Sequence, residues 1–246
     1  MVIYKESKSD GEPTLELITQ IGGFSVVLDV SVFSVEESLI KIAAADLMRS
    51  VTLLSFDSEK QTLSTIAREL SPRWLSAALI VDNEHVVFAD SNFNLGVLQQ
   101  SINASDEDII RLTNVGEQYS GNFINRFRIG RLSSLASVDV IIFGCISGAI
   151  GLIAPLTNEE YALLLRLQNS MESIVGCVGG FDAKGFRKPN STTPIRSSEV
   201  GLLIDGDLCE MLLGLNDADR QQALSCFESV EVELIMALIH RMSLLK

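Results

Sequence analysis

ADLMRSV (residues 45–51) returns further along the chain as ADSNFNL (residues 89–95) and as GCISGAI (residues 144–150). Each copy follows an apolar run rich in β-forming residues, turns on small or polar residues and leads into another apolar run. The copies recur at intervals of roughly 40 to 55 residues, and a period near this size with four strands per unit is typical of β-propeller blades. The repeat therefore predicts a propeller built from strand-turn-strand units.

Short strands fill the chain between residues 15 and 155. Turn residues such as Asp57-Ser58 and Ser71-Pro72 separate them, which favours antiparallel pairing. Grouped by the repeat, they predict about three blades and the outer strands of a preceding one. The polar stretch 101–122 lengthens the second interval, and we expect it to be an insertion on the rim, where extra length costs little closure entropy. The strands predicted before this stretch span residues 15–20, 25–33, 39–45, 51–56, 63–69 and 74–81.

The predicted arc does not close by itself, because a propeller needs about four to eight blades around its axis. An open arc would expose sheet edges, and such edges tend to pair with other chains. We therefore expect the chain to be the C-terminal piece of a longer polypeptide, or to dock on a partner that completes the ring.

Helical spacing replaces the strand pattern after residue 156. Thr157 and Glu160 match a capping box, and the apolar spacing after them predicts a long helix. Residues 178–198 are rich in Gly, Pro, Ser and Thr and predict a connecting loop. Asp207 as N-cap with Glu210 predicts the start of the next helix. Two more helices are expected, one capped by Asn216 or Asp217 and one over residues 230–245.

The predicted fold class is mostly β with an α C-terminal domain. An incomplete β-propeller of about three blades occupies residues 1–156, and a helical domain occupies residues 157–246.

The charge balance bears on the kind of partner. The formal net charge is -13, whereas proteins that wrap nucleic acid usually carry a clustered basic face. If nucleic acid matters here, we expect a partner to touch it. No apolar run reaches the ~18 residues that a membrane span needs, so no membrane association is expected. The four cysteines lack CxxC spacing, which favours reduced, intracellular thiols.

The sequence gives no pattern for catalysis. His85 and His240 lie outside any known nucleophile motif, and no Gly-rich phosphate loop follows a strand. Asp205, Asp207 and Glu210 form a tight acidic cluster, but their spacing fits helix capping better than a metal site. We therefore predict no enzyme activity, no catalytic residues, no metal and no cofactor.

Five motifs give the chain a family resemblance. They are DLMRSV (46–51), IARELSPRW (66–74), NFNL (92–95), GAIGLI (148–153) and LIDGDLCE (203–210). In this order they resemble the C-terminal part of the proteins of one superfamily. Its members are the large subunit of damaged-DNA-binding protein, the A subunit of the mRNA cleavage and polyadenylation factor and a splicing scaffold. DLMRSV, the tryptophan strand and NFNL are most similar to the ubiquitin-ligase adaptor member, whereas residues 206–210 are closer to the splicing scaffold. The resemblance implies three propellers and a C-terminal helical domain, of which this chain would hold the last blades and that domain.

The function implied by the resemblance is scaffolding. The favoured member links a cullin-RING ubiquitin ligase to substrate-receptor proteins with WD40-type propellers during DNA repair, in nucleus and cytoplasm, and nucleic acid is reached only indirectly. One alternative is a scaffold subunit of an mRNA 3′-end processing or splicing complex. An alternative of another class is a protein that binds nucleic acid directly.

The resemblance also implies a receptor-facing set of residues. Trp74, Leu47 and Ile146 would supply apolar anchors, and Arg49 a forked donor for an acid or carbonyl. From the sequence alone, Trp74 could instead be a core residue, since tryptophan is mostly buried. Arg49 could equally be a solvated charge on the rim. The full set is Leu47, Arg49, Arg68, Trp74, Leu132, Ser134 and Ile146.

Overall fold

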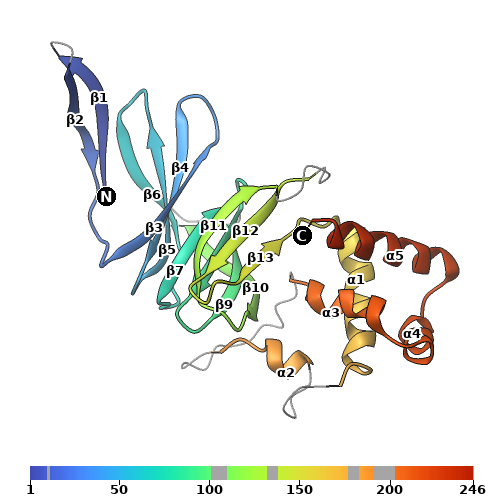
Figure 1. Cartoon of the computed structure of the whole chain (residues 1–246). Helices are drawn as coiled ribbons and strands as arrows, with labels where there is room; N and C mark the ends of the chain where they lie inside the picture. The colour runs from blue at the N-terminus through green and yellow to red at the C-terminus, as the bar shows by residue number, and fades with distance from the viewer. Residues whose placement is uncertain (10–11, 101–109, 132–137, 177–182, 191–202, 246) are drawn as a thin grey trace.

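The computed structural model describes residues 1–9, 12–100, 110–131, 138–176, 183–190 and 203–245 (Figure 1). Strands make up the N-terminal part and helices follow, which confirms a mostly β fold with C-terminal helices. None of the described helices is both long and apolar enough to cross a membrane.

Three antiparallel meanders follow an N-terminal hairpin. The hairpin pairs β1 (Val2–Ser9) with β2 (Glu12–Gln20). The first meander comprises β3 (Val27–Ser34), β4 (Leu39–Asp46), β5 (Ser50–Asp57) and β6 (Thr62–Arg68). The second comprises β7 (Leu75–Ile80), β8 (His85–Asp90), β9 (Asn94–Gln100) and β10 (Ile110–Tyr119). The third comprises β11 (Ile124–Gly130), β12 (Val140–Cys145) and β13 (Ile150–Ile153).

A short parallel pairing joins the outer strands of the first two meanders. Ile110 and Arg111 of β10 lie beside Ala67 and Arg68 of β6, so one eight-stranded sheet runs in the order β3-β4-β5-β6-β10-β9-β8-β7. The sheet folds back on itself, because the Ile80 amide of β7 donates to the Ser31 hydroxyl of β3 at 3.0 Å. Its two terminal strands therefore lie against each other.

The meanders stack face to face in chain order. One face of the first meander packs on the second around Leu53, Leu75 and Phe88, and its other face packs on the hairpin around Leu54 and Phe56. The second meander uses its remaining face to cover the third, around Ala89, Leu95 and Phe127. The inner strands also share polar contacts. The Ser76 hydroxyl of β7 donates to the Ile124 carbonyl of β11 at 2.7 Å, and Arg126 of β11 pairs with buried Asp29 of β3.

Two glycines let a phenyl ring lie over the neighbouring strand at equivalent places in the repeat. Phe88 lies directly opposite Gly96, and Phe143 lies directly opposite Gly151. A Cβ at Gly96 would approach the Phe88 ring to 2.5 Å, and a Cβ at Gly151 would approach the Phe143 ring to 2.1 Å. The second and third meanders therefore share a packing feature as well as a sequence phrase.

The helices enclose a separate apolar core. Helix α1 (Asn158–Glu172) contributes Leu164, Leu167 and Met171, and α5 (Ser229–Ser243) contributes Ile235 and Ile239. The remaining elements are α2 (Ala183–Arg187), α3 (Gly206–Glu210), the 3-10 helix η2 (Met211–Gly214) and α4 (Asp217–Leu224).

Several local predictions are confirmed. Thr157 caps α1 and closes the expected capping box with Glu160, and Asn216 caps α4 through the Asp219 amide.

Three local predictions are wrong, and one strand was not predicted. The stretch 101–122 contains strand β10 rather than an insertion alone, because β10 completes the second meander beside β9. Asp205, not Asp207, is the N-cap of α3, since its side chain accepts from the Leu208 amide. The stretch 178–198 holds a short helix, α2. The chain before residue 12 forms β1, which the sequence did not predict.

Candidate protein-interaction surface

The three copies of the repeated phrase make the same backbone hydrogen bond. The residue at the third position of each copy donates its amide to a carbonyl just before an inner strand: Leu47 to Val26 at 2.8 Å, Ser91 to Trp74 at 2.8 Å, and Ile146 to Phe123 at 3.1 Å. The three acceptors each precede the first strand of their meander by one residue. The three turns are therefore equivalent, and they lie at the same end of each meander. We call this end the turn edge, comprising residues 46–49, 90–93 and 145–148 with Val26, Trp74 and Phe123.

A carboxylate shapes the first two turns. Asp46 accepts the amides of Met48 at 2.8 Å and Arg49 at 3.1 Å, and Asp90 accepts those of Asn92 at 2.9 Å and Asn94 at 3.0 Å. Such side-chain-to-backbone bonds are how aspartate stabilises a turn.

The third turn replaces this carboxylate with Cys145. Here Gly148, with a positive φ of 88°, donates its amide to the Cys145 carbonyl at 3.0 Å. Glycine adopts this conformation without steric cost. The second turn makes the equivalent bond, from the Phe93 amide to the Asp90 carbonyl at 3.2 Å.

Trp74 and Ile146 are exposed at the turn edge. Trp74 is 60% exposed and Ile146 is 71% exposed, while Leu47 is half-buried. The alternative that Trp74 is a core residue is therefore wrong. Its neighbours Arg73 and Leu75 are buried, and the alternation of an extended chain turns Trp74 outward between them.

Arg49 is exposed, as the alternative of a rim charge predicted, but one of its nitrogens is fixed. Its Nη1 donates to the Gly23 carbonyl at 2.5 Å, and the other two guanidinium nitrogens bond to no described residue. The remaining donors of the guanidinium fork therefore point to solvent and can meet an acceptor of a partner.

Arg68 ends β6, the outermost strand of the first meander, on the side of the turn edge. It is half-buried and its Nε is enclosed without a hydrogen-bond partner, which limits its use at a surface. The predicted residues Leu132 and Ser134 lie outside the described residues.

Sequence reasoning missed two exposed residues in the turns, Met48 and Phe93. Met48 is 55% exposed and Phe93 is 38% exposed. Phe93 has a positive φ of 65° and makes edge-on contacts with Tyr119 and Phe123, with ring centroids 6.4 Å and 6.2 Å apart. The sequence contained a signal for both residues, because Gly, Pro, Asn, Asp and Ser dominate turns, and a large apolar side chain among them is unusual.

A buried ion cluster lies directly behind Trp74. Arg73 donates from Nε to Glu69 at 2.9 Å, and from Nη1 and Nη2 to the two oxygens of Glu117 at 2.7 Å and 2.9 Å. Asp90 lies 3.8 Å from Arg73 Nη1, and the Ser50 hydroxyl donates to Glu69. The cluster joins the first meander to the second and fixes the backbone that carries Trp74.

Burial and pairing shift the pKa values in this cluster. Burial raises the pKa of Glu69 and the pKa of Asp90 above their ordinary values, although hydrogen bonds oppose the rise. Burial alone would lower the pKa of Arg73, but the hydrogen bonds to Glu117 and the charge of Glu69 outweigh it and raise that pKa. Arg73 is therefore a permanent cation, and the neighbouring carboxyl groups of Glu69 and Asp90 hold their protons more tightly than usual.

The segment around α2 reaches the turn edge of the second meander. The Asn190 amide donates to Asn94 Oδ1 at 2.8 Å, and Asn94 Nδ2 donates to the Asn190 carbonyl at 2.7 Å. Arg187 pairs with Asp205 at 2.5 Å, so the segment is also held by the helical part. Phe186 is exposed and lies edge-on to Tyr119, with ring centroids 5.9 Å apart.

The acidic cluster near α3 has a structural explanation. Asp205 accepts from the Leu208 amide and from Arg187, in keeping with the expected capping role of this cluster. Over the described part of the chain, no three His, Cys, Asp or Glu side chains gather in a way that could hold a metal ion.

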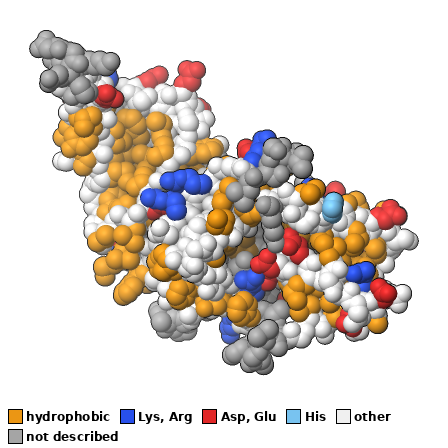
Figure 2. Space-filling model, in the orientation of Figure 1, with side chains coloured by type: hydrophobic (Ala, Val, Ile, Leu, Met, Phe, Trp, Pro, Cys, Tyr) orange, Lys and Arg blue, Asp and Glu red, His pale blue; other side chains and the backbone are white. Residues whose placement is uncertain are grey.

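An apolar stripe covers the outer face of β3. Val26, just before the strand, and Leu28, Val30 and Val32 within it are all exposed. Figure 2 shows hydrophobic side chains gathered on the side of the molecule formed by the N-terminal strands. Exposed apolar patches are typical of interaction sites and ligand grooves.

Comparison with known proteins identifies a family to which the chain is similar. A family model described as the CPSF A subunit region matches residues 4–214. DNA damage-binding protein 1a of Arabidopsis thaliana is 36% identical over 199 residues, which cover 78% of this chain and 18% of that protein. DNA damage-binding protein 1 of Solanum lycopersicum is 32% identical over 248 residues, covering 98% of this chain and 22% of that protein. The chain thus spans about a fifth of the length of these relatives.

Proposed function

The chain belongs to the family of the CPSF A subunit region, and from this premise we propose that it acts as a protein-interaction scaffold whose turn edge binds a partner protein. The observation that carries the proposal is the turn edge itself. Equivalent turns from three meanders place exposed apolar side chains at one end of the sheet stack, with a guanidinium beside them. Large apolar anchors and arginine are the residues that dominate binding energy at protein interfaces.

We propose further that the three meanders are blades of a β-propeller. In support, they stack face to face in chain order, and their inner strands β3, β7 and β11 contact one another through polar bonds. The outer face of β3 is apolar and exposed, and β13 ends its sheet without a fourth strand among the described residues. The exposed face of β3 suits packing against a further blade, and the free edge of β13 suits pairing with a further strand. Together, such additions would complete the ring.

The partner class that we propose is the set of substrate-receptor proteins with WD40-type propellers that a cullin-RING ubiquitin ligase uses in DNA repair, in nucleus and cytoplasm. The names of the relatives support the link to DNA damage. The net charge of -13 favours an indirect route to DNA, through the receptor, over direct binding of phosphates. We propose no enzyme activity for the chain.

The test is affinity purification from cell extract with the full chain as bait, followed by binding measurements with the purified receptor. Trp74→Ala and Ile146→Ala should each weaken receptor binding at least tenfold, since truncation of a central apolar anchor costs about 2 kcal/mol or more. Val230→Ala is the matched control, because Val230 is an equally exposed apolar side chain on α5, far from the turn edge in sequence and fold.

The outcomes separate the alternatives. Unchanged receptor binding by folded Trp74→Ala and Ile146→Ala variants would remove the turn edge from the interface. Co-purification of polyadenylation or splicing subunits in place of receptors would contradict the ligase assignment. Direct DNA binding that falls steeply with salt would contradict the indirect route, because phosphate contacts produce that slope.

A further inference from the structure

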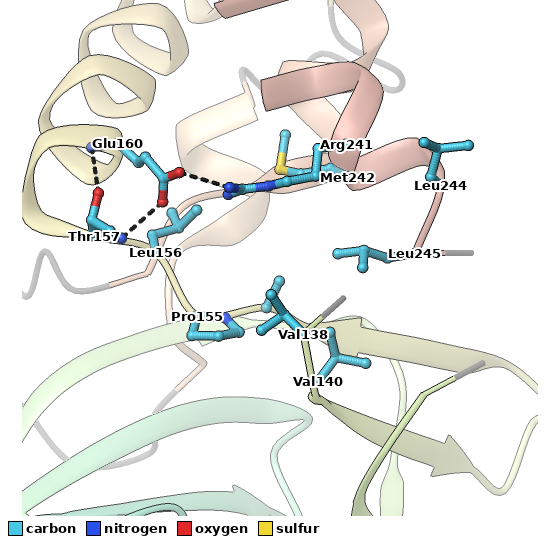
Figure 3. A pocket seen from close by; sticks show the side chains of 11 residues that line it. Val138, Val140, Pro155, Leu156, Thr157, Glu160, Arg241, Met242, Leu244 and Leu245 are labelled. Carbon is cyan, nitrogen blue, oxygen red and sulfur yellow. Dashed lines mark hydrogen bonds and ion pairs between the residues drawn. The ribbon is translucent and has the colours of Figure 1, made fainter. Parts of the chain in front are cut away.

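A cavity of about 340 Å³ lies between the third meander and the ends of two helices (Figure 3). It is lined from the sheet side by the start of β12 and by the link from β13 to α1, and from the helix side by the end of α5. In the third meander the turn edge joins the end of β12 to the start of β13. The cavity therefore lies at the opposite end of this meander from the turn edge, and it is a separate site.

The walls of the cavity are mainly apolar. Figure 3 shows Val138, Val140 and Pro155 on the sheet side, with Met242 and Leu244 on the helix side. No described side chain fills the space between the sheet side and the helix side of the cavity. A cavity of this size is at the lower end of the range for small-molecule sites, which are apolar with a few placed polar groups.

One corner of the cavity is polar, and it offers donors rather than acceptors. Glu160 accepts from Arg241 Nη1 through Oε1 at 2.8 Å and from the Thr157 amide through Oε2 at 2.9 Å. The bond to Arg241 lowers the pKa of Glu160, so its carboxylate is ionised and both of its oxygens are engaged. Arg241 is half exposed, and its Nε and Nη2 bond to no described residue.

We propose that this cavity binds a small monocarboxylic acid whose compact apolar body lies between the sheet and helix walls and whose carboxylate accepts from Arg241. Guanidinium is the side chain best suited to a carboxylate, because its donors form a planar fork. An amine would instead compete with Arg241 for Glu160 and would break an existing pair. A neutral alcohol would fill the same walls but could not form a charge-assisted hydrogen bond with the remaining donors of Arg241.

The experiment titrates the full chain with three probes that share a body and differ in the head group: cyclohexylacetate, 2-cyclohexylethanol and 2-cyclohexylethylamine. Backbone amide shifts of the ¹⁵N-labelled chain report where each probe binds. Cyclohexylacetate should perturb the amides of residues 154, 156, 157 and 241–245 with a Kd on the order of 1 mM, the affinity expected of a ligand with about ten non-hydrogen atoms. The alcohol should bind about tenfold more weakly, because one charge-assisted hydrogen bond is lost, and the amine more weakly still.

Two variants make the test specific. Arg241→Gln should lower the affinity for the acid about tenfold and leave that for the alcohol unchanged. Arg166→Gln is the matched control, because Arg166 forms a similar exposed pair with Glu231 at 2.6 Å between the same two helices but does not line this cavity. A filling variant, Ala154→Leu, should weaken acid and alcohol alike.

Two results would overturn the proposal. In the first, the acid perturbs no amide around the cavity at a concentration about ten times the expected Kd. In the second, the acid and the alcohol bind equally and Arg241→Gln changes neither, which would leave a hydrophobic crevice with no preference for carboxylate.

Discussion

Replacement of Arg73 by methionine is expected to be the most damaging single change at the junction of the first two meanders. Methionine keeps most of the apolar stem but removes three charge-assisted hydrogen bonds, one to Glu69 and two to Glu117. The side chains of Arg73, Glu69 and Glu117 are only 8%, 3% and 3% exposed, so water cannot replace the lost partner. Removal of one partner of such a buried pair costs about 3–5 kcal/mol of unfolding free energy.

The measurement is equilibrium urea unfolding, followed by circular dichroism and by the fluorescence of Trp74, the sole tryptophan. Arg131→Met is the control, because Arg131 pairs with Asp139 at 2.6 Å with both side chains half exposed, and exposed pairs contribute little. Arg73→Met should lower the urea midpoint strongly, whereas Arg131→Met should leave it almost unchanged.

A second variant tests the cause. If the loss comes from uncompensated carboxylates, the triple variant Arg73→Met, Glu69→Gln, Glu117→Gln should be more stable than Arg73→Met alone, because the stranded charges are gone. The reasoning is refuted by an Arg73→Met variant that loses less than about 1 kcal/mol, or by a triple variant that is no more stable than the single one.

Three further predictions concern packing, pH and thiol chemistry. Gly151→Ala should destabilise the fold by about 1–3 kcal/mol through overpacking against the phenyl ring of Phe143. Gly22→Ala is the control, because nothing lies within 4 Å of a Cβ at that position. Equal urea midpoints for the two variants would contradict the prediction. Burial raises the pKa of Glu69 above its ordinary value of 4.5. Proton binding by Glu69 therefore contributes native-state stability that is complete below about pH 4.5 and is lost as the pH rises through the folded-state pKa. Unfolding free energies measured from pH 4 to pH 8 should therefore fall with pH more steeply in the wild type than in Glu69→Gln, and parallel curves would show that Glu69 titrates normally. Burial raises the pKa of the Cys209 thiol to about 12, so Cys209 should resist alkylation at pH 8 in the native chain while exposed Cys226 reacts, as peptide mass spectrometry can check; modification of Cys209 at the rate of Cys226 would contradict its burial.

The strand-turn-strand units could be predicted from the sequence because their determinants are local. An apolar run and a turn residue such as Asp46 lie within ten residues of each other, and the capping box of Thr157 and Glu160 lies within four. Strand β10 could not be predicted in this way. Its residue Glu117 is buried only because Arg73 approaches from another part of the chain, so a charged residue of the core looks like one of a solvated loop.

Pairing between residues far apart in the sequence also explains two other differences between the predicted and the observed sites. Asp205 and Asp207 are equally good N-caps by type, and the choice of Asp205 coincides with its pairing to Arg187, a residue eighteen positions away. Trp74 resembles a core residue in sequence because it precedes an apolar strand. It faces outward because its neighbour Arg73 points inward to the buried ion cluster. The inward direction of Arg73 depends on the carboxyl groups of Glu69, Asp90 and Glu117, two of which are distant in sequence.

The turn edge is not uniformly free, and this shapes what can bind there. In the second meander, Asn94 stabilises the turn through Asp90 and also exchanges two hydrogen bonds with Asn190 of the α2 segment. In the first and third meanders, the side chains of Met48 and Ile146 are exposed. A partner would therefore meet apolar anchors at the two outer meanders and Trp74 between them, with the α2 segment occupying part of the middle turn. Since that segment is tied to Asp205 through Arg187, the position of the helical part and the shape of the partner surface are set by the same contacts.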